Sequence, residues 1–199
     1  MKTEKLFKII NFSLIGLGVF FIPLFAHADI GVPMIFISLP YMAIGLLPVV
    51  LIETMVFRKI FNLTYKKSVW TVAISNLVST LIGIPIAWIV LVLFEILTMG
   101  SRAYGIDSIF KKFLAVTWQA PWLIPYEKEL YWMIPSASLV LLIPFFFASW
   151  KVEFWVMEKY FPEIKVSELK SAEWKMNLFS YLFLAVCNVI WVIYSIFNH

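Results

Sequence analysis

Residues 69–98 read VWTVAISNLVSTLIGIPIAWIVLVLFEILT, and Glu95 is the only charged residue among them. A helix needs about 20 apolar residues to cross the roughly 30 Å of hydrocarbon in a bilayer, because each residue rises about 1.5 Å. This stretch exceeds that length, so it predicts a transmembrane helix.

The composition of the whole chain agrees with a membrane protein. Of its 199 residues, 62% are hydrophobic and 14% are charged, against about 45–50% and about 25% in a soluble domain. Three further apolar segments, 31–53, 130–150 and 176–197, are long enough to span a bilayer. We therefore predict an all-α integral membrane protein, a four-span helical bundle over residues 29–199, whose first partner is the lipid bilayer.

The amino terminus resembles a secretory signal peptide. Lys2, Lys5 and Lys8 precede an apolar run over 9–25, which ends at Ala26-His27-Ala28. Small residues at the first and third positions before a break suit signal peptidase. Residues 1–28 are therefore expected to be removed by cleavage between Ala28 and Asp29, and an uncleaved first transmembrane helix is the alternative.

The basic residues predict the orientation of the spans. Those on the first eight residues and on the 54–68 and 151–175 loops number 12, and the 99–129 loop holds 4. Cytoplasmic segments carry the excess of Lys and Arg, so both mature termini are expected in the periplasm of a bacterium, with the spans in its cytoplasmic (inner) membrane. Because the 16 basic residues lie between the hydrophobic segments rather than on one polar face, no nucleic-acid partner is expected.

Two of the connecting loops are amphipathic. In the outer loop, apolar residues recur at helical spacing: Ile106, Ile109, Phe110, Phe113, Leu114 and Trp118. This pattern predicts a helix in the outer membrane interface, and a surface for a periplasmic partner is the alternative. The 151–175 loop has equal numbers of Glu and Lys, which favours a solvated, ion-paired helical stretch, with a docking surface as its alternative.

Segment 31–53 contains Pro33, Pro40 and Pro48. Each proline inside a helix removes one backbone hydrogen bond. The segment is therefore expected to be a kinked helix packed in the bundle. A broken helix that lines a transporter binding site is the functional alternative.

The span over 69–98 carries a stripe of polar and small residues. Asn76, Ser79 or Thr80, Gly83 and Ala87 share one face at steps of three and four. Such stripes let membrane helices pack closely and hydrogen-bond. We expect a helix-packing face, in which Asn76 contacts Asn188 of the last span. A substrate or ion path shared by these residues is the alternative.

Two acids lie at predicted membrane depth. Antiparallel threading places Glu53 near the cytoplasmic interface and Glu95 near the outer one. Each is expected to reach headgroups or water at its own interface. Because intramembrane acids mark functional sites by default, a role in gating or ion coupling is the alternative.

Residues for common catalytic chemistry are scarce. The histidines are His27 and His199, the aspartates are Asp29 and Asp107, and there is one cysteine. Histidine-dependent nucleophilic sites, a pair of intramembrane aspartates and cysteine-cluster metal sites are therefore not expected. No phosphate-binding glycine motif is present. We expect no catalytic residues, no cofactor and no metal.

The run from Gly31 through Pro40 and Pro48 to Glu53, with the polar stripe that follows, resembles bacterial multi-pass membrane proteins. Some cyanobacterial proteins implicated in filament integrity are among them. The resemblance covers about residues 30–98 and rests on no defined motif. It therefore implies no function and no site residues.

These observations predict a non-enzymatic scaffold or accessory subunit of a membrane complex, with a membrane-protein partner or a second copy of the chain. The first alternative is a small oligomeric transporter or channel that uses Asn76, Glu95 and Asn188. The second alternative is an interfacial lipid-modifying enzyme, for which Glu53 and Glu95 are the candidate acids.

Overall fold

The computed structural model describes residues 32–99, 103–123 and 127–198. The predicted signal peptide, residues 1–28, and its cleavage site between Ala28 and Asp29 lie outside the described residues. Cleavage and the alternative of an uncleaved first helix therefore stay predictions.

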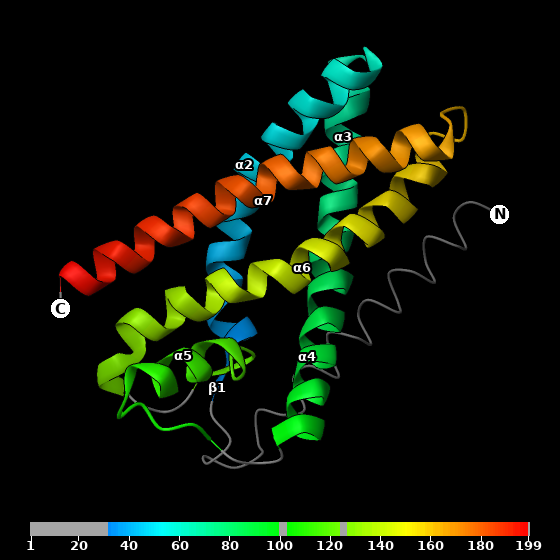
Figure 1. The fold of residues 1–199 in the computed structure, drawn as a ribbon. Helices are drawn as coiled ribbons and strands as arrows, with labels where there is room; N and C mark the ends of the chain where they lie inside the picture. Colours follow the sequence, from blue (N-terminus) through cyan, green and yellow to red (C-terminus); the bar gives the residue numbers. More distant parts are fainter. Residues whose placement is uncertain (1–31, 100–102, 124–126, 199) are drawn as a thin grey trace. The chain divides into compact units, whose positions relative to one another are not determined.

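Four long helical segments make up most of the described chain (Figure 1). Each is long and apolar enough to cross a membrane, and the second passes through a π-helical turn, η2, between α3 and α4. Their bounds are α2 (Met34–Phe61), α3 (Tyr65–Val78), η2 (Ser79–Gly83), α4 (Ile84–Met99), α6 (Leu130–Tyr160) and α7 (Val166–Phe197). The predicted all-helical fold with four spans is confirmed.

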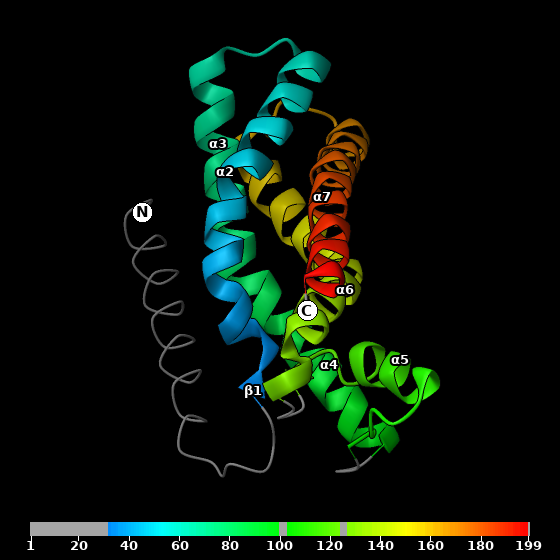
Figure 2. The same cartoon turned by 90° about the vertical axis from the view of Figure 1, so that its left-hand side faces the viewer.

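The chain between the second and third spans returns to the start of the first. Strand β1 (Val32–Pro33) pairs antiparallel with β2 (Trp122–Leu123), and the Met34 N–H donates to the Pro121 carbonyl at 3.0 Å. The 3-10 turn η3 (Glu127–Glu129) then leads into α6. We call this the α5 end of the bundle, and the end that carries residues 62–64 and 161–165 the turn end (Figures 1 and 2).

Helix α5 (Ile109–Thr117) forms where the amphipathic pattern predicts a helix. Ser108 caps it, because the Lys111 N–H donates to the Ser108 hydroxyl at 3.3 Å. Its outer face exposes Ile109, Phe110 and Phe113. The location of this face in a membrane interface stays a prediction.

The helices run past the ends of the apolar segments. Helices α6 and α7 extend to Tyr160 and from Val166, so the loop predicted over 151–175 shrinks to 161–165. Likewise the loop predicted over 54–68 shrinks to 62–64. Glu and Lys are good helix formers, and a helix satisfies its own backbone groups in water as well as in lipid. A change in hydropathy therefore does not end a helix.

Asn62 makes the sharp turn between α2 and α3. Its φ of 51° places it in the left-handed region, and its N–H donates to the Arg58 carbonyl at 2.8 Å. Asn is one of the few residues other than Gly that adopt this conformation readily at the end of a helix. The turn brings α3 back beside α2.

The π-helical turn lies in the middle of the second span. Pro85 has no N–H to donate to the carbonyl of Leu81. The Ile84 N–H donates to the backbone carbonyl of Ser79, five residues earlier, which is the hydrogen bond of a π-helix. The Thr80 hydroxyl donates to the Asn76 backbone carbonyl at 2.8 Å, and the Ser79 hydroxyl oxygen lies 3.0 Å from the same carbonyl. Such turns are frequent at functional sites, and this one lies beside the polar centre described below.

Helix α2 is continuous through Pro40 and Pro48. The hypothesis of a broken first helix is therefore wrong. Neighbouring helices and local adjustments can compensate for the backbone hydrogen bonds that prolines remove in membrane helices.

A hydrophobic core closes the turn end. The turn-end cluster consists of buried side chains from α2, α3, α6, α7 and the last loop: Phe57, Val72, Met157, Phe161, Leu169 and Met176. The ring of Phe57 meets those of Phe61 and Phe161 edge to face, with centroids 5.1 Å apart in both pairs. This cluster fixes the four spans against one another just outside the polar centre.

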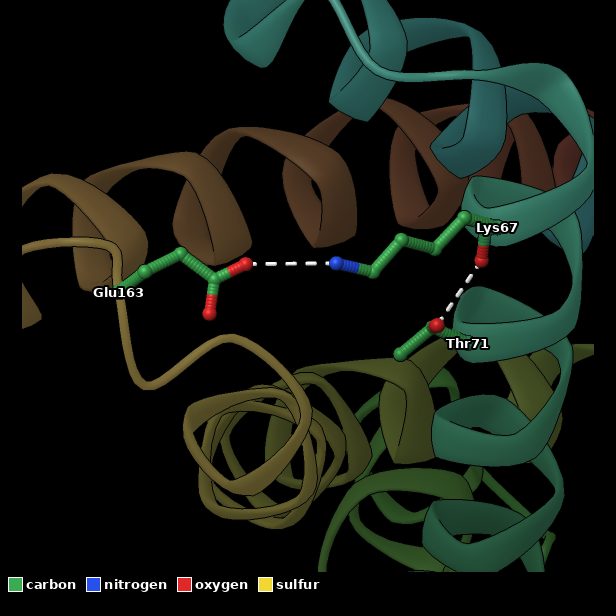
Figure 3. A network of polar contacts seen from close by, with 3 residues as sticks. All are labelled: Lys67, Thr71 and Glu163. Atoms are coloured by element: carbon green, nitrogen blue, oxygen red, sulfur yellow. Dashed lines mark hydrogen bonds and ion pairs between the residues drawn. The ribbon is translucent and has the colours of Figure 1, made fainter.

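An ion pair crosses the surface of the turn end (Figure 3). The Lys67 ammonium lies 3.3 Å from a Glu163 carboxylate oxygen, and the two side chains are 50% and 59% exposed. A backbone hydrogen bond at Glu163 itself and then the bond from Lys67 lower the pKa of Glu163 below its ordinary value.

Glu163→Gln is expected to leave the unfolding temperature at pH 7 nearly unchanged, because exposed ion pairs contribute little. The lowered pKa means that any contribution is present above the ordinary pKa of glutamate and is lost as the pH falls through the lowered value. Thermal unfolding of both proteins in detergent at neutral and acid pH measures this. A drop of several degrees at pH 7 would contradict it.

Candidate functional site

The interior of the bundle holds polar side chains from all four spans. We call them the buried carboxylate cluster: Glu53, Asn76, Ser79, Glu153, Glu173, Asn177 and Ser180. All are almost completely shielded from solvent. Glu153 and Glu173 stand about 10 Å along their helices from the turn end and Glu53 about 12 Å, at about 1.5 Å per residue.

Glu53 on α2 joins two other helices. The Asn76 amide on α3 donates to one of its carboxylate oxygens, and the Ser180 hydroxyl on α7 donates to the other at 2.6 Å. Both carboxylate oxygens of this buried acid therefore have donors.

Glu153 on α6 makes a parallel set of contacts. The Ser79 hydroxyl on η2 donates to one carboxylate oxygen at 2.6 Å, and the Asn177 amide on α7 donates to the other at 2.8 Å. The π-helical turn thus supplies one of the two donors. Two acids and four donors link the four spans.

Glu173 on α7 is different, because no described residue hydrogen-bonds either of its carboxylate oxygens. It lies within electrostatic range of both Glu53 and Glu153. The side-chain amide oxygen of Asn177 (Oδ1) also has no partner among the described residues. Buried polar groups are normally satisfied, so these acceptors mark a place where a proton, a water molecule or a ligand is expected.

Among the residues that the structure describes, no basic side chain forms an ion pair with the cluster. The ion pairs found among the described residues lie elsewhere, at Lys67–Glu163, Lys111–Asp107, Lys112–Glu129 and Lys165–Glu168. An uncompensated buried charge is very costly in a low-dielectric interior. The cluster therefore requires positive charge from another source, either bound protons or a bound cation.

A cavity of about 530 Å³ reaches the cluster from the side. Its polar end is formed by Asn76, Ser79, Thr80, Ser149, Glu153 and Tyr181. Its walls are mostly apolar and come from α2, α6 and α7, with Pro48, Leu141, Phe145 and Leu184 among them. Ile44 and Leu47 line it and are 72% and 73% exposed, so the cavity opens at the flank of α2, which lies beside α7 (Figure 2).

The structure gathers part of the predicted polar set at this site. Asn76 and Ser79 belong to the cluster, and Thr80 lines the cavity. Asn188 also lines the cavity, but its amide donates to the Leu184 carbonyl of its own helix at 2.9 Å. The predicted contact between Asn76 and Asn188 is therefore wrong, because Asn76 bonds Glu53 instead.

The two predicted interfacial acids are both buried. Glu53 does not reach headgroups, because the helices extend beyond it and enclose it in the cluster. Glu95 lies near the α5 end, is 8% exposed and hydrogen-bonds Gln119. Glu95 does not line the cavity, so the structure separates it from the residues with which the transporter hypothesis grouped it.

Sequence reasoning missed four of the seven residues of the cluster. Glu153 and Glu173 lie in the predicted 151–175 loop, and Asn177 and Ser180 of the last span were not singled out. A signal was present, since Glu173, Asn177 and Ser180 follow one another at steps of four and three, the spacing of one helix face. That signal needed the helix boundary, which hydropathy alone does not give.

Comparison with protein-family models, with curated proteins and with solved structures finds no match to this chain. The fold itself defines the class: a multi-span helical membrane protein embedded in a lipid bilayer. Among the described residues, no group of three or more His, Cys, Asp or Glu side chains is placed to hold a metal ion.

Proposed function

We propose that this protein is a small transporter or channel for a positively charged species, that it works as an oligomer and that it is not an enzyme. The observation that carries the proposal is the buried carboxylate cluster at the end of a cavity, with no basic partner among the described residues. Ionisable groups inside a membrane are costly and mark ion or substrate pathways.

The sign of the charge supports a cation. When they are ionised, the three buried carboxyl groups repel anions and attract cations and protons. We expect an oligomer because the bundle is small: four spans with side chains packed between them do not enclose a continuous pore without a second copy.

Flux into proteoliposomes tests the proposal. Purified protein is reconstituted in phosphatidylcholine vesicles, and uptake of protons, alkali-metal cations and organic cations is followed against empty vesicles. Flux of a cation that depends on the protein supports the proposal. Absence of protein-dependent flux for all three classes, in vesicles that contain folded protein, overturns it.

We also propose that the membrane is the cytoplasmic membrane of a bacterium and that the turn end faces the cytoplasm. The support is the set of basic residues near the turn end: Arg58, Lys59, Lys66 and Lys67. The carboxyl terminus then lies in the periplasm.

A fusion of alkaline phosphatase to the carboxyl terminus of the full chain is therefore expected to be active. The phosphatase needs disulfides, which form in the oxidising periplasm and not in the cytoplasm. A fusion of a fluorescent protein that folds only in the cytoplasm is the matched control and should stay dark. The opposite pair of results would reverse the orientation.

A non-enzymatic scaffold or accessory subunit is the second candidate. The observation that favours it is the outer face of α5, where Ile109 is 89% exposed beside Phe110 and Phe113. Purification of tagged protein in mild detergent should then recover a stoichiometric membrane partner, and Phe110→Ser should release it. Recovery of the chain alone, together with cation flux, would favour the transporter.

A further inference from the structure

We propose that the cavity beside the buried carboxylate cluster binds a hydrophobic organic cation, an ammonium or phosphonium compound with an apolar body, and that Glu153 is its counter-ion. This inference rests on the proposed function and names the ligand class of the same site.

The apolar walls of the cavity set the first requirement for the ligand. Apart from the polar end and a few hydroxyl and amide groups, the lining consists of aliphatic and aromatic side chains. The volume lies within the range of small-molecule sites, about 300–1,000 Å³. A bare inorganic cation would find few oxygen ligands along these walls, whereas an apolar body would bury its surface there.

The charge of the cavity sets the second requirement. Among the described residues, Glu153 is the only one with a carboxyl group that lines the cavity, and no Lys, Arg or His lines it. Glu53 and Glu173 lie within electrostatic range of Glu153 and, when ionised, add to its negative field. An anionic or neutral amphiphile gains nothing from this field, whereas a cation supplies the positive charge that the cluster lacks.

Aromatic rings line the same cavity. They come from α2, α6 and α7: Tyr41, Phe145, Tyr181, Phe183 and Trp191. Tyr41 and Trp191 pack together with ring centroids 4.8 Å apart. This contact joins the first part of α2 to the last part of α7. Ring faces attract ammonium-type cations, most strongly where water is excluded. The lining therefore combines an apolar surface with two kinds of contact for a cation, the carboxylate of Glu153 and the faces of aromatic rings.

The opening of the cavity suits a ligand that arrives from the membrane. Ile44 and Leu47 on its rim belong to a membrane-spanning helix and are strongly exposed. Hydrophobic cations partition into bilayers, so they reach such an opening from the lipid side. An inorganic cation would have to cross hydrocarbon to enter by the same route.

Two probes of nearly equal shape and opposite charge test the inference. Full-length protein is placed in phosphatidylcholine nanodiscs, and binding of tetraphenylphosphonium and tetraphenylborate is measured as the excess over empty nanodiscs. We expect saturable excess binding of tetraphenylphosphonium and none of tetraphenylborate. Equal binding of both probes would identify a general apolar groove and overturn the inference, as would no excess binding of either.

Variants on α6 then assign the counter-ion. Glu153→Gln is expected to weaken tetraphenylphosphonium binding about thirtyfold or more, because it removes a buried charge partner. Glu158→Gln removes an exposed carboxylate from the same helix and should bind like the wild type. Glu153→Asp keeps the charge and should retain part of the affinity. Equal losses in all three variants, or no loss in Glu153→Gln, would overturn the role of Glu153.

The result separates this inference from the proposed function. Cation flux by a protein that ignores tetraphenylphosphonium would leave the transporter proposal standing and reject the ligand class. Charge-selective, Glu153-dependent binding without flux of any cation would support the ligand site and reject transport.

Discussion

Proteoliposomes that contain Glu153→Gln are expected to lose about nine-tenths or more of the cation flux of the wild type, while the variant protein unfolds at the same temperature or higher. The loss follows from removal of the carboxylate of Glu153, which among the described residues is the one that lines the cavity. A buried, hydrogen-bonded charge partner is worth about 2–5 kcal/mol to its counter-ion, which corresponds to roughly thirtyfold or more in binding.

The retained stability has a separate reason. Glutamine has nearly the shape of glutamate, and its amide removes one of three carboxyl groups that repel one another in the cluster. Ser79 still has an oxygen to which it donates. The side-chain amide oxygen of Asn177 (Oδ1) has no partner among the described residues, so a flip of the Asn177 side-chain amide lets that oxygen accept a hydrogen bond from the new glutamine amide.

Glu158→Gln is the matched control for flux and for thermal unfolding. It lies on the exposed surface of α6, five positions from Glu153, and should leave both quantities unchanged. Wild-type flux in Glu153→Gln would remove Glu153 from the pathway. A clear fall in its unfolding temperature would show that the cluster serves the stability of the bundle rather than transport.

Phe57→Ala is expected to lower the free energy of unfolding by about 3–5 kcal/mol, the usual cost of removing a buried aromatic side chain. Phe57 is fully buried, and its ring packs edge to face against Phe61 and Phe161 in the turn-end cluster. Its loss leaves a cavity between α2 and the loop that joins α6 to α7. Denaturant unfolding in mixed detergent micelles measures the change.

Met55→Ala tests whether burial causes this effect. Met55 is on the same helix, two positions away, and is 67% exposed at the surface of the bundle. Its replacement should cost less than about 0.5 kcal/mol, as is usual for surface positions. Equal effects of the two substitutions would mean that the turn end is not a packed core.

The sequence predicted the existence of the four spans but not their lengths. An apolar run as long as 69–98 is typical of a membrane span. A span of this kind is a helix, because hydrocarbon accepts a backbone only when its hydrogen bonds are satisfied internally. The ends of α6 and α7 escaped prediction because the segments beyond 150 and before 176 are charged, and charged residues continue a helix as readily as they form a loop.

The difference between apolar and charged segments also explains which residues of the site the sequence predicted. Asn76, Ser79 and Thr80 stood out because polar residues within an apolar span are rare and share one helix face. Glu153 and Glu173 did not, because the other charged residues of the 151–175 stretch are Lys and Glu residues that are exposed in the structure. Alternation of charged residues along the chain does not show which of them point into the bundle.

The sequence by itself determined that this chain is a helical membrane protein with four spans, since hydropathy and the length of a helix suffice for that conclusion. Only the tertiary structure decided that Glu53, Glu153 and Glu173 belong to one buried cluster and that a cavity reaches that cluster at Glu153. Three acids separated by 20 to 120 positions come together through the packing of α2, α6 and α7. Which face of each helix turns inward depends on its neighbours, and no single helix encodes it.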